Sequence, residues 1–154
     1  MLDKFNFNAL VKFEDNDFIT QAYQSVLLRE PDDGGRKCYL DALHNGTSKL
    51  QILLILRISE EGRMMNIRIK DFNINTIDIN FLLNLDGQSF VEAAYISILG
   101  RSPSYQERNH YFNLVNINRA DRIDFIYALR NSEEGKLLSV DIIGLDAYRN
   151  CHES

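Results

Sequence analysis

The sequence contains little cysteine and no long hydrophobic run. Its two cysteines in 154 residues, Cys38 and Cys151, have dissimilar neighbours, which does not indicate a disulfide framework and favours a reducing compartment. No window approaches the roughly eighteen uninterrupted apolar residues that a membrane-spanning helix needs. The opening segment MLDKFNFNAL carries Asp3 and resembles neither a signal peptide nor a membrane anchor. We therefore expect a cytoplasmic protein without membrane insertion, or a secreted or surface protein if the chain is part of a larger one.

The sequence also lacks an excess of basic residues. Lysine and arginine number 17 against 22 acidic residues, which gives a net charge of −5. This balance disfavours a protein that binds nucleic acid mainly through the phosphate backbone. We predict no nucleic-acid partner.

The chain repeats itself. DFITQAYQSVLLREP, from Asp17, matches SFVEAAYISILGRSP, from Ser89, and LRISEEG, from Leu56, matches LRNSEEG, from Leu129. A period of this length indicates one supersecondary unit used twice. The predicted organisation is a first repeat unit over residues 1–68, a joint over 69–78, and a second repeat unit with a C-terminal tail over 79–154.

Both units have the pattern of helices. Apolar residues recur at helical spacing from Phe18 to Leu27 and from Phe90 to Leu99, so each stripe should face a core. The matched core positions are Phe18, Tyr23 and Leu53 in the first unit and Phe90, Tyr95 and Ile126 in the second. An alternation near residues 73–80 fits a short extended piece or a linker entering a short helix near 79–85. We favour the linker and expect strands in neither unit. The sequence predicts an all-α fold of two tandem homologous helical-bundle units packed as one compact domain.

Several polar residues fit helix ends. Ser89 with Glu92, and Ser104 with Glu107, have the S-x-x-E spacing of a capping box, which predicts that helices begin there. Ser59 and Ser132 should cap short helices that follow them. Arg57 and Glu61, like Arg130 and Glu134, are four residues apart and are predicted to form surface ion pairs.

The stretch VLLREPDDGG places two acids and two glycines after Pro31, which raises the question of a cation site. It lacks the alternating oxygen ligands of a calcium loop, and its counterpart Ser104–Glu107 keeps neither the paired acids nor the glycines. We expect a helix start here and no calcium. The residues Cys38, His44, His110, Cys151 and His152 lack the spacing of a zinc site, so no metal and no cofactor are predicted.

The sequence offers no pattern for catalysis. Neither a nucleophile with a positioned base nor two carboxylates in different environments can be assigned from spacing. The polar features occur in both units, which suits helix ends better than one asymmetric active site. We predict that the protein is not an enzyme.

Two arginines have alternative interpretations. Arg29 and Arg101 each follow an apolar helix and precede a proline. There a guanidinium can satisfy the last carbonyls of the helix, or it can reach an anionic sugar or a carboxylate of a partner. Tyrosines can complete a core or stack on a sugar, and the groove between two units is a natural ligand site. The candidate residues for binding a ligand or partner are Arg29, Arg101, Tyr39, His110 and Tyr111.

These repeated segments resemble the bacterial family called domain of unknown function 4214 (DUF4214). Its repeat reads approximately F-V-x-x-L-Y-x-x-x-L-G-R-x-P-D-x-x-G-x-x-Y-W, followed by a serine-capped S-x-E-F. The likeness covers about residues 14–66 and 86–139. This chain departs from the pattern where Cys38-Tyr39 and His110-Tyr111 replace the tyrosine-tryptophan pair.

The resemblance implies a small helical module without established catalytic activity. The family occurs beside glycosyltransferases and methyltransferases of surface-polysaccharide assembly and in secreted or surface-layer proteins. We therefore expect a non-catalytic binding or scaffolding module in bacterial cell-envelope polysaccharide biosynthesis, with a protein partner such as a glycosyltransferase. The alternative is a carbohydrate-binding module that holds a surface glycan. A third possibility is an accessory part of a glycosyltransferase or methyltransferase.

Overall fold

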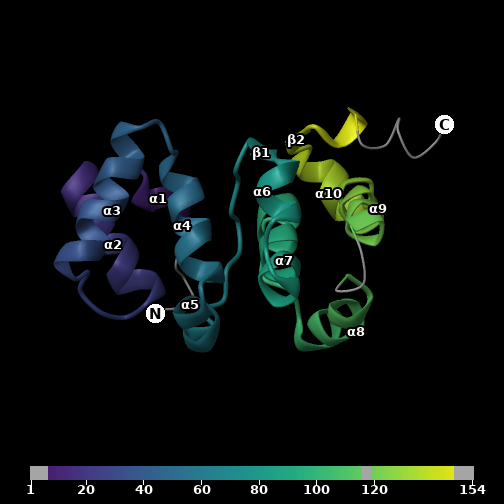
Figure 1. The fold of residues 1–154 in the computed structure, drawn as a ribbon, viewed down its shortest axis with the longest axis horizontal. Helices are drawn as coiled ribbons and strands as arrows, with labels where there is room; N and C mark the ends of the chain where they lie inside the picture. The colour runs from purple at the N-terminus through teal and green to yellow at the C-terminus, as the bar shows by residue number, and fades with distance from the viewer. Residues whose placement is uncertain (1–6, 116–118, 148–154) are drawn as a thin grey trace. The chain divides into compact units, whose positions relative to one another are not determined.

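The computed structural model in Figure 1 describes residues 7–115 and 119–147. Side chains are described in these ranges except at residues 7, 111–115 and 119–120. The chain divides into two compact units, residues 1–71 and 72–154. Most of the described residues are helical, and they contain two short strands. The predicted all-α class is confirmed.

The first unit consists of helices. In chain order they are α1 (Phe7–Leu10), α2 (Asp15–Val26), α3 (Asp33–His44), α4 (Lys49–Ile58) and α5 (Glu60–Met65). Helix α3 begins where the paired acids of VLLREPDDGG stand, because the side chain of Asp32 accepts a hydrogen bond from the backbone N–H of Gly35 at 2.6 Å. This is the N-cap arrangement. The stretch therefore opens a helix, as predicted.

The second unit repeats this helix order and adds two strands (Figure 1). Its elements are β1 (Thr76–Asp78), α6 (Ile79–Leu83), α7 (Gly87–Ala94), the π-helix η2 (Tyr95–Leu99), α8 (Tyr105–Val115), α9 (Arg119–Arg130), α10 (Glu133–Leu138) and β2 (Asp141–Ile143). Strands β1 and β2 pair in parallel, with Thr76 opposite Asp141. The expectation of no strands was wrong at residues 76–78 and 141–143. The alternation in the first of these segments reflects a strand with Ile77 buried between two exposed residues.

The matched apolar stripes lie in the cores of their own units. All six predicted core residues are buried, namely Phe18, Tyr23, Leu53, Phe90, Tyr95 and Ile126. The stripe that occupies α2 in the first unit is divided between α7 and η2 in the second. In both units the chain then turns through a residue with positive φ, Leu28 at 58° and Gly100 at 75°. The repeat thus extends to the backbone conformation after the first long helix.

The predicted helix starts were partly confirmed. Ser104 and Glu107 form the expected capping box, with reciprocal hydrogen bonds of 3.1 and 2.9 Å between side chain and backbone N–H. The box predicted at Ser89 and Glu92 was wrong, because α7 begins earlier and Asp86 is its N-cap, accepting from the N–H of Ser89 at 3.0 Å. Because Asp86 caps the helix, the side chain of Glu92 is not needed there. It makes a different contact, with Arg108.

Candidate functional site

Arg29 forms a two-pronged ion pair with Glu61 in the first unit. Its Nε donates to Oε2 at 2.7 Å and its Nη2 donates to Oε1 at 3.0 Å. The guanidinium also lies over the ring of Tyr23, 5.2 Å from the ring centroid. The hydrogen bonds from Arg29 lower the pKa of the Glu61 carboxyl and raise that of the guanidinium. The pair connects the turn after α2 to the start of α5.

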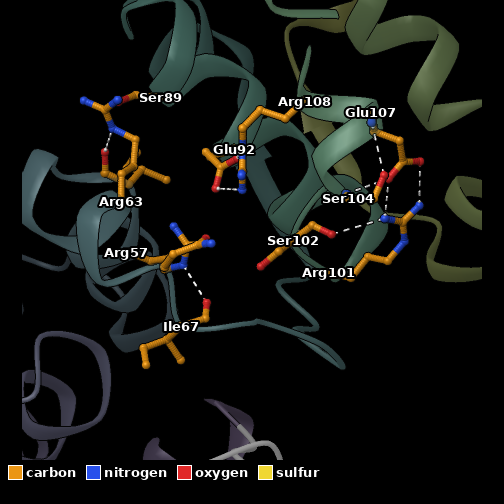
Figure 2. A network of polar contacts seen from close by, with 12 residues as sticks. Arg57, Arg63, Ile67, Ser89, Glu92, Arg101, Ser102, Ser104, Glu107 and Arg108 are labelled. Atoms are coloured by element: carbon orange, nitrogen blue, oxygen red, sulfur yellow. Dashed lines mark hydrogen bonds and ion pairs between the residues drawn. The ribbon is translucent and has the colours of Figure 1, made fainter. Parts of the chain in front are cut away.

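Arg101 repeats this arrangement in the second unit. Its Nε donates to Oε2 of Glu134 at 2.8 Å and its Nη2 to Oε1 at 2.9 Å, and the guanidinium lies 5.5 Å from the ring centroid of Tyr95. It also binds Glu107, the capping-box residue, with hydrogen bonds of 2.9 and 3.1 Å (Figure 2). Hydrogen bonds from Arg101 lower the pKa of Glu107 to about 2. Arg101 thus connects three segments of its unit.

The structure corrects two expectations about these ion pairs. The carbonyls that Arg29 and Arg101 contact belong to Glu30 and Ser102, which lie after the helix ends, so the arginines do not cap the last helical carbonyls. The pairs expected four residues apart were also wrong. Glu61 and Glu134 bind arginines 32 and 33 residues upstream.

Arg57 and Arg130, expected in those pairs, instead hold the chain after the last helix of each unit. The Nε of Arg57 donates to the carbonyl of Ile67 at 2.8 Å (Figure 2), and the Nε of Arg130 donates to the carbonyl of Val140 at 2.7 Å. Arg57 is fully buried. These guanidiniums therefore have a packing role that a surface ion pair would not give them.

A second repeated cation was missed in the sequence. Lys49 and Arg122 stand at matching positions, and each donates to two backbone carbonyls at or just after the end of the first helix of its unit. The acceptors are Val11 at 3.1 Å and Phe13 at 2.6 Å in the first unit, and Leu83 at 3.2 Å and Leu85 at 2.5 Å in the second. Both residues thus cap a helix end from a distance. The sequence did carry a signal for this contact, because a basic residue stands at the same position of both repeats while the residues around it differ.

A buried ion pair distinguishes the second unit. Glu92 is only 3 % exposed, and it accepts hydrogen bonds of 2.6 and 3.1 Å from Arg108 (Figure 2). At the same places in the first unit, Arg36 donates to Thr20 at 2.9 Å. A buried carboxylate needs such a partner because desolvation disfavours its charge. Glu92, which was expected to cap a helix with Ser89, therefore forms a buried ion pair with Arg108 instead.

The structure brings together only part of the predicted binding set. The ring of Tyr39 meets that of Tyr23 edge-on, with centroids 6.1 Å apart, so Arg29 and Tyr39 contact the same tyrosine. Burial raises the pKa of Tyr39 to about 12. His110 is exposed on α8, and the side chain of Tyr111 lies outside the described residues.

Two apolar side chains are exposed at matching positions in the units. Met64 on α5 is 79 % exposed and Leu137 on α10 is 87 % exposed. They follow the repeated sequence E-E-G with one basic residue between, Arg63 in the first unit and Lys136 in the second. Among the large apolar side chains that the structure describes, these two are the most exposed. The repeat thus keeps an apolar residue where no core requires it.

Residues 7–115 and 119–147 contain no group of three or more histidine, cysteine or acidic side chains that could hold a metal ion. Cys151 and His152 lie outside these residues. Within the same ranges, no helix has the length and apolar character needed to cross a bilayer.

Comparison with known families agrees with the resemblance seen in the sequence. The family model described as domain of unknown function DUF4214 matches residues 3–65. No curated protein and no solved structure shows significant similarity to the chain. Over residues 3–65, which include α1 to α5 of the first unit, the chain is therefore similar to the DUF4214 family.

Proposed function

We propose that the chain is a non-catalytic scaffolding module that binds a protein partner through the exposed sides of α5 and α10. The observation that carries this proposal is the recurrence of an exposed apolar residue, Met64 and Leu137, at the same place in both units. A single exposed apolar residue is common on protein surfaces and needs no explanation. Its recurrence beside residues of the same charge is a reason to assign it a role.

The surroundings of each apolar residue suit a protein interface. Glu60 and Arg63 flank Met64, and Glu133 and Lys136 flank Leu137. An apolar centre with a polar, charged rim is the usual composition of such contacts. Two equivalent contacts on one chain would also allow a bivalent partner to bind more tightly than one contact does.

A non-catalytic role is supported by how the repeated polar residues are used. Arg29, Arg101 and their glutamates form ion pairs within their own units. A nucleophile or base must instead reach a substrate. From the family resemblance, we propose a partner in bacterial cell-envelope polysaccharide biosynthesis, such as a glycosyltransferase, that acts in the cytoplasm.

Site-specific photo-crosslinking tests this proposal. A photoreactive amino acid would be placed at position 64, at position 137, or at the exposed control position Lys37 on α3, whose side chain is 79 % exposed. We expect crosslinks in bacterial cells to the same glycosyltransferase from positions 64 and 137 and none from 37. Equal crosslinking from all three positions, or none from 64 and 137, would contradict the proposal.

A further inference from the structure

The second unit contains a cavity of about 350 Å³ between the end of α9 and the segment that carries β2. This volume lies at the lower end of the range for small-molecule pockets. Its polar lining comes from the residues Tyr127, Arg130, Asn131, Ser139, Asp141 and Asp146. None of them belongs to the ion pairs of Arg101.

Three of the polar side chains that line this cavity are held in place by hydrogen bonds to the backbone. The Nε of Arg130 donates to the carbonyl of Val140 at 2.7 Å. The side-chain amide of Asn131 donates to the carbonyl of Tyr127 at 2.9 Å. The hydroxyl of Ser139 donates to the carbonyl of Lys136 at 3.0 Å. Groups fixed in this way lose little conformational entropy when they bind a ligand.

The first unit shows that the fold does not need two of these polar residues, Tyr127 and Asn131. There, Leu54 stands at the position of Tyr127 and Ile58 at the position of Asn131, while Arg57 makes the same contact to the following chain as Arg130. Leu54 and Ile58 are buried. At these two positions the first unit thus has buried apolar residues, whereas the second unit has a tyrosine and an asparagine.

We propose that this cavity binds a neutral saccharide unit. Sugar hydroxyls both donate and accept, and the lining offers the carboxylates of Asp141 and Asp146 as acceptors and the guanidinium of Arg130 as a donor. Tyr127, one of the lining residues, would offer its ring to the apolar face of a pyranose. Two carboxylates against one guanidinium disfavour an anionic ligand such as phosphate. The polar lining likewise disfavours a purely apolar ligand.

Titration of the intact chain, followed by the backbone NMR signals, tests this assignment. The probes are the methyl glycosides of glucose, galactose, mannose and N-acetylglucosamine, with glucuronate and inorganic phosphate as anionic comparisons. We expect at least one neutral glycoside to shift the signals of residues 127–131 and 139–146, with weaker or no shifts from the anions. Absence of shifts from every neutral glycoside up to about 50 mM, or stronger binding of the anions, would overturn it.

Two variants test whether a saccharide that binds to the protein occupies this cavity. Asn131→Ile installs the residue of the first unit, and Asp141→Asn removes one exposed carboxylate while preserving its shape. Each should raise the dissociation constant at least about tenfold, whereas Lys37→Ala in the first unit should leave it unchanged. Unchanged affinity in Asp141→Asn, whose fold can be checked from its NMR spectrum, would contradict the assignment even if Asn131→Ile fails to fold. This outcome is independent of the crosslinks from positions 64 and 137.

Discussion

Arg101 binds Glu134 through the same pairs of atoms by which Arg29 binds Glu61. In both units Nε meets Oε2 and Nη2 meets Oε1, at 2.7 to 3.0 Å. The two units share this contact although many residues between its members differ. A contact that is present in both copies indicates that the fold depends on it. In each unit the ion pair holds the last short helix against the turn that follows the first long helix.

The first prediction compares two substitutions of arginine by lysine. Lysine keeps the charge but cannot form a two-pronged contact. Arg101→Lys should lower the free energy of unfolding by about 1–2 kcal/mol, because Arg101 holds two carboxylates, and Arg29→Lys should lower it by less than about 1 kcal/mol as an exposed pair. Urea unfolding of the two variants measures the difference. A larger loss in Arg29→Lys would contradict the role assigned to Glu107.

The second prediction concerns acid stability. The pKa of Glu107 falls from 4.5 to about 2 in the folded protein, so its contribution is present above the unfolded pKa and is lost as the pH falls toward about 2. Because 33 % of the side chain is exposed and water screens the pair, we expect a contribution of about 1–2 kcal/mol. Urea unfolding of the wild type and Glu107→Gln should differ by this amount near neutral pH and converge in acid. A constant difference at every pH would contradict it.

The third prediction exchanges the residues at the turn with positive φ. Leu28 adopts φ 58° where the second unit has Gly100 at 75°, and this conformation is strained for any residue with a Cβ. Leu28→Gly should therefore raise the free energy of unfolding by about 0.5–1 kcal/mol. Gly100→Leu should destabilise, because a Cβ there would lie 3.0 Å from the carbonyl oxygen of Phe72. Thermal melts of both variants would show whether the signs are opposite, as this account requires.

The fourth prediction concerns the replacement of the glycine in each S-E-E-G segment by alanine. A Cβ on Gly135 would lie 2.1 Å from the carbonyl oxygen of Leu129, and one on Gly62 would lie 2.0 Å from that of Leu56. Either glycine changed to alanine should lower the free energy of unfolding by about 2–4 kcal/mol. The control is Gly34→Ala on α3, where the nearest atom would be 3.9 Å away. Similar melting temperatures for all three variants would count against the close packing described here.

The sequence predicted what depends on local pattern. The apolar stripes, the serine caps and the capping box at Ser104 involve residues three or four positions apart, so spacing alone identifies them. Ser89 with Glu92 has the same spacing but a different role. Asp86 caps the helix, and Glu92 meets Arg108, 16 residues away.

The contacts between distant residues were not predictable from such spacing. Glu61 has Arg57 four residues before it in the chain, yet it binds Arg29, because Arg57 is buried against the segment that follows α5. Lys49 and Arg122 act on carbonyls more than thirty residues away. The pairing of β1 with β2 likewise joins segments about 65 residues apart. For the contacts of the arginines and of Lys49, the repeat held the missing information, because the same partners recur in both units. Among the described residues, the two strands, by contrast, occur only in the second unit.

The measurement that tests the central claim most directly is made on the double variant Arg29→Ala/Arg101→Ala. Thermal melting and crosslinking from positions 64 and 137 would be recorded on the same protein, the crosslinking at a temperature below its melting point. We predict a lower melting temperature than that of the wild type and undiminished crosslinking, because the arginines fasten helices and the partner binds elsewhere. A double variant that melts like the wild type and loses the partner would show that the arginines are binding residues and would contradict the account.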